Sequence, residues 1–206
     1  RRTSRPAWTA KVNVLVACEF SGIVRDAFIA AGHDAMSCDL LPSERPGPHY
    51  QGDIRDMLDD GWDLLIAHPP CTYLANSGVR WLYGGKGGYR DPERWRLMEQ
   101  AADFFRLLLH ANAPRIAVEN PIVHQYAREI IGSRPTQIIQ PWQFGHGETK
   151  ATALWLVGLP RLAPTDIVDG RRPRVHHASP GPDRWRERSR TLPGIAVAMA
   201  EQWNFG

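Results

Sequence analysis

The segment VNVLVACEFSGIVRDAFIAAG, residues 12–32, decides the class of fold. Residues 12–17 form an apolar run rich in β-branched side chains, which predicts a buried strand. Residues 22–31 follow as a helix that ends at Gly32, and residues 35–40 are a second predicted strand. A strand, a turn, a helix and another strand in this order form the unit from which parallel sheets are built.

The same alternation continues to the end of the chain. After a proline-rich loop, further strands are predicted at 63–67, 116–119, 136–140 and 151–157. Helices are predicted at 54–58, 94–110 and 195–202, with one more that has Pro121 in its first turn and runs to residue 131. We therefore predict an α/β fold with a mostly parallel sheet and helices on both faces. The glycine-rich segment 84–90 is either a lid over a site or a plain surface loop.

Length and composition favour one domain. The chain has 206 residues, which suits a single catalytic domain over residues 11–206. Residues 1–10 show no periodicity, so we expect a loose arm there. Its apolar stretches are shorter than a membrane span requires, and no apolar segment follows the N-terminal arginines as in a secretory signal. Three cysteines do not form a disulfide framework. They favour a reducing compartment, and we expect the cytoplasm.

The basic residues are concentrated near the end of the chain. The net charge of +3 is only mildly basic, but residues 171–190 hold seven arginines against Asp183 and Glu187. This excess suits contacts with phosphates, and a solvated basic loop is the alternative. None of the cysteines has Cys-x-x-Cys spacing, and the adjacent pair His176 and His177 does not by itself make a zinc site, so no metal is predicted.

Polar turns follow the first three predicted units, where parallel α/β sheets bind ligands. The first turn, Phe20-Ser21-Gly22, opens a helix whose backbone N–H groups suit a carboxylate or phosphate. Asp39 ends the second strand and is placed to accept hydrogen bonds from ribose hydroxyls. The third turn, Gly52-Asp53-Ile54, suits an adenine ring. The three turns in order predict a site for a nucleoside-containing cofactor.

Two reactive side chains follow later strands. Two prolines present Cys71 in the turn His68-Pro69-Pro70-Cys71-Thr72, and Glu119 ends the strand before Asn120. A thiolate that adds to carbon 6 of a pyrimidine makes carbon 5 nucleophilic, while a carboxyl group of raised pKa supports the charge change at nitrogen 3. The alternative for Cys71 is a buried, inert cysteine, which is what we expect of Cys18 and Cys38.

In order and spacing, these residues resemble the cytosine-5 DNA methyltransferase family over residues 12–125. The resemblance implies a Rossmann-like S-adenosylmethionine-dependent methyltransferase fold, a DNA substrate, Cys71 as nucleophile and Glu119 as its carboxylate partner. It also implies a cofactor site formed by Phe20, Ser21, Gly22, Asp39, Leu40, Asp53, Ile54 and Pro69. Residues 140–145, 150–155 and 188–196 resemble short phage-type members, which would act in the host cytoplasm.

The chain departs from the family in two places. The family's Gly-Phe-Pro-Cys-Gln is replaced around Cys71, so the expected substrate contacts are Pro70, Thr72, Asn120, Lys150, Thr152, Arg188 and Arg190. The family's sequence-reading domain is missing, because only residues 158–188 occupy its place. Alternatives therefore remain: DNA modification with little sequence specificity, a separate recognition partner, a free pyrimidine nucleotide such as dCMP as substrate, or a non-catalytic nucleic-acid-binding module.

Overall fold

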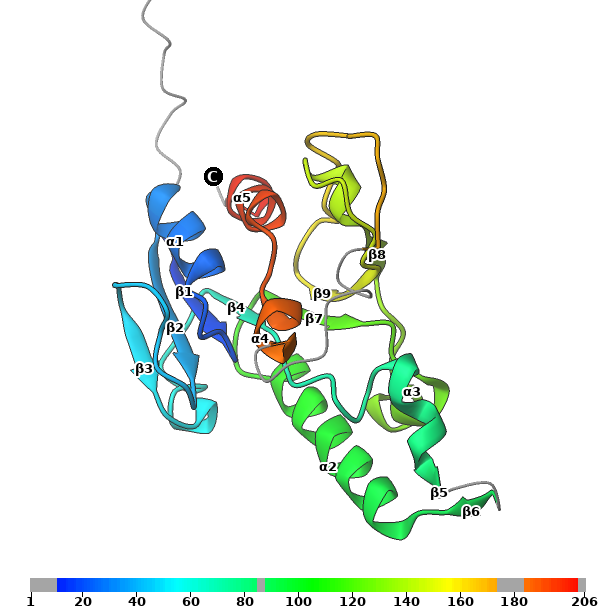
Figure 1. Ribbon diagram of the computed structural model, residues 1–206. Coiled ribbons are helices and arrows are strands. Elements are labelled where there is room, and N and C mark those ends of the chain that lie inside the picture. The colour runs from blue at the N-terminus through cyan, green and yellow to red at the C-terminus, as the bar shows by residue number, and fades with distance from the viewer. Residues whose placement is uncertain (1–10, 85–87, 174–183, 204–206) are drawn as a thin grey trace, which may run out of the picture.

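The computed structural model describes residues 11–84, 88–173 and 184–203, and the expected arm over residues 1–10 lies outside them. Its main feature is a seven-stranded sheet in the order β3-β2-β1-β4-β7-β9-β8 (Figure 1). The strands of this sheet are β1 (Asn13–Ala17), β2 (Asp34–Asp39), β3 (His49–Gln51), β4 (Leu64–Ala67), β7 (Ile116–Pro121), β8 (Gln137–Ile139) and β9 (Thr152–Val157).

Most neighbouring strands of the sheet run parallel. The pairs β1·β2, β1·β4, β2·β3 and β4·β7 are parallel, whereas β9 is antiparallel to both β7 and β8. The α-helices are α1 (Ile23–Ala30), α2 (Pro92–Leu109), α3 (Gln125–Ile131), α4 (Arg184–Ser189) and α5 (Pro193–Gln202). This topology, with the reversed strand β9 beside the edge, confirms the predicted Rossmann-like methyltransferase fold.

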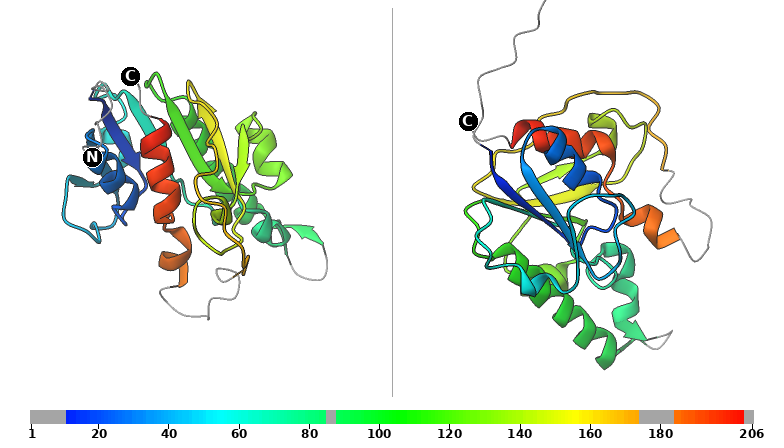
Figure 2. Two further views of the ribbon diagram at one scale, coloured as in Figure 1. Left: turned by 90° about the horizontal axis from the view of Figure 1, so that it is seen from above. Right: turned by 90° about the vertical axis from the view of Figure 1, so that its left-hand side faces the viewer.

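Helices cover both faces of the sheet, with α1 and α5 on one face and α2 on the other (Figure 2). On the α1 and α5 face, Val14 and Ile66 of the sheet pack with Phe28, Met199 and other apolar side chains of the two helices. A second cluster packs α2 and α3 against the opposite face. The strands are apolar on both faces because both are buried, as expected of a parallel sheet.

The prediction for Pro121 was wrong. Pro121 is the last residue of β7, paired with Thr152 of β9, and not the first turn of a helix. The ladder with β9 extends the strand beyond Glu119, and α3 begins only at Gln125. The side chain of His124 caps that helix by accepting a hydrogen bond from the backbone N–H of Ala127 at 3.2 Å. Tertiary pairing therefore outweighs the local preference of proline for a helix start.

Several shorter segments also differ from the prediction. The helix expected at 54–58 is a single 3₁₀ turn, η1 (Ile54–Asp56), and the proline-rich loop contains β3. The described ends of the glycine-rich segment pair as β5 (Tyr83–Gly84) and β6 (Tyr89–Arg90); residues 85–87 between them lie outside the described part. Two further 3₁₀ segments are η2 (Asn76–Leu82) and η4 (Pro141–Gln143). Among the described residues, no helix is long and apolar enough to cross a membrane.

Candidate active site

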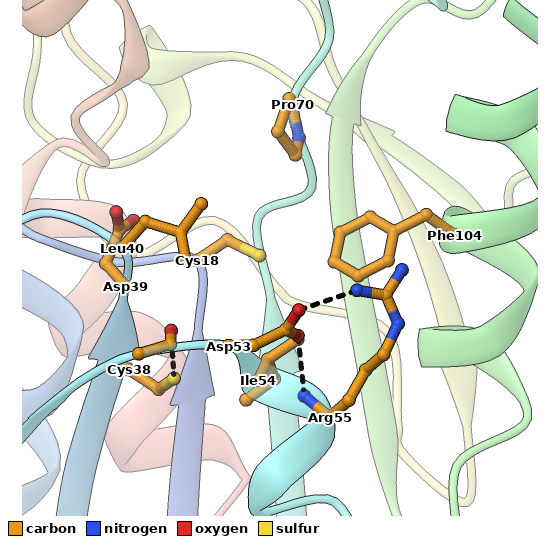
Figure 3. Close-up of a pocket in the computed structure, with 10 residues that line it drawn as sticks. Cys18, Cys38, Asp39, Leu40, Asp53, Ile54, Arg55, Pro70 and Phe104 are labelled. Carbon is orange, nitrogen blue, oxygen red and sulfur yellow. Dashed lines mark hydrogen bonds and ion pairs between the residues drawn. The ribbon is translucent and has the colours of Figure 1, made fainter. Parts of the chain in front are cut away.

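A pocket of about 150 Å³ lies at the carboxyl ends of β1, β2 and β4 (Figure 3). This volume is smaller than that of a site for a whole drug-sized ligand, and it suits one planar part of such a ligand. Figure 3 shows Leu40 and Cys18 on one side of the pocket and Phe104 with Arg55 on the other. The lining residues are Cys18, Cys38, Asp39, Leu40, Gly52, Asp53, Ile54, Arg55, Pro70 and Phe104.

The polar groups of the pocket fit the ribose and base of a nucleoside. The Asp39 carboxylate accepts hydrogen bonds from the backbone of Leu41, at 2.9 Å, and of Leu40; lone pairs remain for ribose hydroxyls. Burial raises the Asp39 pKa. The Asp53 carboxylate accepts hydrogen bonds from the backbone N–H of Arg55 at 3.0 Å and from the Arg55 guanidinium at 2.7 Å. Both bonds lower the Asp53 pKa, and the backbone bond has the larger effect. The apolar faces of Ile54 and Phe104 suit an adenine ring.

The turn after β1 is occupied by the chain's own carboxylate. Glu19 Oε1 accepts hydrogen bonds from the backbone of Val24 at 2.7 Å and the Ser21 hydroxyl at 3.1 Å, and Oε2 accepts one from the backbone of Arg25 at 3.2 Å. The N–H groups that were expected to hold a bound anion are therefore already bonded. Neither Ser21 nor Gly22, both expected at the cofactor, is among the residues that line the pocket.

Arg25 ties this turn to the loop that borders the pocket. Its guanidinium is fully buried and donates to the carbonyl oxygens of Pro46 at 3.0 Å and Pro48 at 3.5 Å, and to the hydroxyl of Ser43 at 3.1 Å. The same side chain pairs with Asp26 at 2.8 Å. Arg25 thereby fixes the segment that follows Asp39 and Leu40 in the chain.

The segment around α4 closes over the turn from the other side. The ring of Phe20 lies 5.8 Å from that of Trp185, and Arg190 forms two hydrogen bonds to Glu44, at 2.7 and 2.9 Å. In Figure 1, α4 lies below α5, near the ends of the central strands. Phe20, expected at the cofactor, thus lies against Trp185, and Arg190, expected at the substrate, is paired with Glu44.

The turn that carries Cys71 is held by Asn120 of β7. The Asn120 side chain is 1 % exposed, and its amide donates to the carbonyl of Pro69 at 2.8 Å. The backbone N–H groups of Leu74 and Ala75 both donate to the carbonyl of Cys71, at 3.0 and 2.9 Å. Asn120, expected at the substrate, therefore fixes the proline turn that presents the thiol.

Cys71 is half-buried, and its thiol is the resting form. Burial raises the Cys71 pKa, the charge of Glu119 raises it further, and the charges of Lys150 and Arg188 oppose both. The net pKa lies above that of an ordinary cysteine, so attack requires removal of the thiol proton. Cys18 and Cys38, expected to be inert, line the pocket, and burial raises the pKa of both, that of Cys38 to about 11.

Glu119 lies against His68, and its ionisation differs from the prediction. His68 Nδ1 is 2.9 Å from Glu119 Oε2. Burial raises the Glu119 pKa, but the hydrogen bond and charge of His68 and the charge of Lys150 outweigh it, so the pKa lies below its usual range. A raised pKa was expected for this carboxyl group, whereas His68 and Lys150 lower it.

The remaining expected substrate residues fall into two groups. Lys150 and Arg188 act electrostatically on Cys71, and Lys150 Nζ donates to the carbonyl of Arg188 at 2.8 Å. Thr72 is exposed next to the thiol. Thr152 is buried, and its hydroxyl donates to the carbonyl of Lys150 at 3.1 Å, so it supports the lysine.

Sequence reasoning missed three features of the site. His68 was interpreted only as a residue that flanks Cys71. Its place directly after a buried apolar strand could have indicated a site residue. Phe104 was placed on a helix face, and Arg55, whose guanidinium lies 5.1 Å from the Phe104 ring centre, was not singled out. Within the described residues, no group of three or more His, Cys, Asp or Glu side chains could hold a metal ion; His176 and His177 lie outside that part.

No protein-family model matches the chain, and no curated protein matches it in sequence. Among solved structures, it is similar to the Dnmt2 methyltransferase of S. pombe, with 17 % identity and a TM-score of 0.46 over 74 % of this chain and 51 % of that one. The methyltransferase EhMeth of Entamoeba histolytica gives 15 % identity and a TM-score of 0.46, over 77 % and 58 % of the two chains. A DNMT2 mutant of Spodoptera frugiperda gives 13 % and 0.42, over 79 % and 57 %. The chain thus spans 51–58 % of the length of these structures.

Proposed function

We propose that this protein transfers a methyl group from S-adenosylmethionine to carbon 5 of cytosine, most directly in DNA. The observation that carries the proposal is the pocket lined by Asp39, Asp53 and Pro70, because Pro70 directly precedes Cys71 and the neighbouring strand β7 carries Glu119. A nucleophile, a carboxylate and a nucleoside pocket at one sheet edge suit methylation of an unreactive pyrimidine carbon.

The residues divide the work of the reaction between pocket and turn. Asp39 and Asp53 bind the adenosine part of the cofactor between Leu40, Ile54 and Phe104. Bound there, S-adenosylmethionine supplies an electrophilic methyl group. Cys71 adds to carbon 6 of the base, and Glu119 supports the charge change at nitrogen 3. Carbon 5 then takes up the methyl group. Its proton passes to solvent as the sulfur departs, and the aromatic ring is restored.

Lys150 and Arg188 support a phosphate-bearing substrate. Both cations act on the thiol, so a phosphate next to the target base would meet them. A duplex would have to release the base from its stack. Because residues 158–188 are too few for a reading domain, we propose that sequence selection, where it occurs, comes from a separate partner.

A free pyrimidine nucleotide such as dCMP is the second candidate. The observation in its favour is that the two cations around Cys71 suffice for one phosphate, whereas Arg190, which would extend the contact along a strand, is paired with Glu44. The candidate requires the same thiol chemistry at carbon 6. It differs from the first only in the size of the substrate.

The test is mass-spectrometric nucleoside analysis after incubation with S-adenosylmethionine and, separately, duplex DNA, single-stranded DNA or dCMP. We expect 5-methylcytosine in DNA. Product from dCMP alone would replace the first candidate with the second, and no product from any substrate would overturn both. Cys71→Ser should abolish product while calorimetry shows nearly unchanged cofactor affinity, because Cys71 is not among the lining residues of the pocket.

Cation variants separate phosphate binding from general charge. Lys150→Ala and Arg188→Ala should raise the KM for DNA and reduce its salt dependence, because each removes a phosphate contact. Arg106→Ala is the matched control, since Arg106 lies on α2 in an exposed pair with Asp103 at 3.5 Å. Equal effects of all three variants would remove the assignment of Lys150 and Arg188 to the substrate.

A further inference from the structure

The sheet register brings His68 and Glu119 together. Ala67 of β4 pairs with Val118 of β7, so the next residues, His68 and Glu119, continue the same row on the same face. The backbone N–H of His68 also donates to the carbonyl of Ala17 at 3.0 Å, which extends the ladder with β1. The histidine is therefore fixed by backbone bonds before its side chain reaches the carboxylate.

The contact with His68 bears on the state of the Glu119 carboxylate. The His68 side chain is 7 % exposed and that of Glu119 is 13 % exposed. His68 Nε2 is buried, and it has no hydrogen-bond partner among the described residues. Donation from His68 Nδ1–H to an ionised Glu119 fits the 2.9 Å contact and the lowered Glu119 pKa. The carboxylate is therefore the acceptor of this bond.

The other charged and titratable groups that act on Glu119 favour the same state. Lys150, which precedes β9, stabilises the carboxylate, and Cys71 couples to it from the catalytic turn. Arg188 of α4 acts on Cys71 and joins Lys150 through its carbonyl. Before the substrate reacts, Glu119 is therefore the anion, and the proton is on the Cys71 thiol.

We propose that His68 is a positioning residue that holds Glu119 ionised and oriented, so that Glu119 accepts the Cys71 proton as the sulfur adds to the base. The inference rests on the proposed function. In this step the S–H bond breaks and a bond from sulfur to carbon 6 forms. Glu119 takes the proton and passes it to nitrogen 3, and the new double bond lies between carbons 4 and 5. Thiol and cytosine are neutral before and after the addition, so no further acid or base is required.

The first test does not require activity. Carboxyl-carbon NMR of ¹³C-glutamate-labelled protein, with the Glu119 signal assigned through Glu119→Gln, reports its titration directly. We expect Glu119 to titrate below the usual glutamate range, and His68→Ala to move the titration upward by about one pH unit or more. His68→Asn, whose amide can donate to the carboxylate, should stay near the wild type. An unchanged titration in His68→Ala would overturn the inference.

The second test uses the pH dependence of methyl transfer. The acid limb of kcat should move to higher pH in His68→Ala and remain in place in His68→Asn, with the KM for S-adenosylmethionine unchanged in both. A rate loss in His68→Ala that is equal at every pH would indicate a merely structural role and overturn the proposal. Absence of methyl transfer in the wild type would instead refute the proposed function, while the NMR titration would still decide the state of Glu119.

Discussion

Gly22 tests whether the buried Arg25 network organises the cofactor edge of the sheet. Gly22 caps α1 with φ of +69°, a left-handed conformation. A Cβ atom placed there would lie 2.5 Å from Arg25 Nη2. Gly61 is a matched control, because its φ is +80° and a Cβ atom there would meet no heavy atom within 4 Å. Alanine at either position meets backbone strain, but only at Gly22 does it also displace the guanidinium.

The expected difference follows from these two costs. The left-handed conformation costs an alanine about 1–2 kcal/mol, which applies to both variants. At Gly22 the guanidinium must shift although it is fully buried and bonded to several groups, and overpacking of this kind adds about 1–3 kcal/mol. We therefore expect Gly22→Ala to lose about 2–5 kcal/mol of unfolding free energy.

Urea unfolding and calorimetric titration with S-adenosylmethionine check both parts. Gly22→Ala should unfold at a lower urea concentration than Gly61→Ala and bind the cofactor more weakly, because Arg25 holds the loop beside Asp39. Gly61→Ala should bind the cofactor as the wild type does. If the two variants have equal stability and equal affinity, the Arg25 network does not organise the pocket and the reasoning is refuted.

Further predictions concern the thiol and the turn. Burial raises the Cys71 pKa most, and the charge of Glu119 raises it further. Glu119→Gln removes that charge, so iodoacetamide should alkylate Cys71 faster at mildly alkaline pH. Lys150→Ala or Arg188→Ala should slow the alkylation, because each removes a charge that lowers the Cys71 pKa. Asn120→Ala should cost about 1–3 kcal/mol of stability, because it leaves a turn carbonyl without its donor, and should lower kcat more than cofactor affinity, as urea unfolding and steady-state kinetics would show. The pKa of Glu119 is lower in the folded protein than in the unfolded chain. The ionised carboxylate therefore stabilises the fold at pH values above the unfolded pKa, and this contribution disappears as the pH falls through the folded pKa. Urea unfolding should show a loss of stability in acid that Glu119→Gln lacks.

Each of these has an informative contrary result. Arg106→Ala should leave alkylation unchanged, and a slowing there equal to that in Lys150→Ala would indicate a general charge effect. A Glu119→Gln protein that loses stability in acid as the wild type does would show that Glu119 does not titrate as described. Unchanged kcat in Asn120→Ala would show that the turn keeps its shape without the amide.

The long buried elements of the fold could be predicted because their patterns are local. β1, β4 and α2 are apolar runs or helical periodicities that tertiary contacts reinforce. β3 could not be predicted in this way: it is three residues long and mostly exposed, and it exists because β2 offers an edge. The start of α3 was missed because pairing with β9 extended β7, and because His124 is not a usual helix cap.

The site was predictable in its placement and less so in its bonding. Because parallel strands end at one edge, sequence order alone brought Asp39, Asp53, Cys71 and Glu119 to the same region. Which side chains bond to one another depends on register and rotamer. The occupied helix start at Glu19 is one example that sequence order does not determine.

The central claim is that Cys71 adds to carbon 6 of cytosine, and trapping with 5-fluorocytosine in DNA tests it most directly. Fluorine replaces the carbon 5 proton whose loss precedes release of the sulfur, so after methyl transfer the protein should remain attached to the DNA. Incubation with S-adenosylmethionine, digestion and peptide mass spectrometry should locate the adduct on Cys71, and Cys71→Ser should give none. An active protein that leaves Cys71 unmodified, or carries the adduct on another residue, would contradict this mechanism.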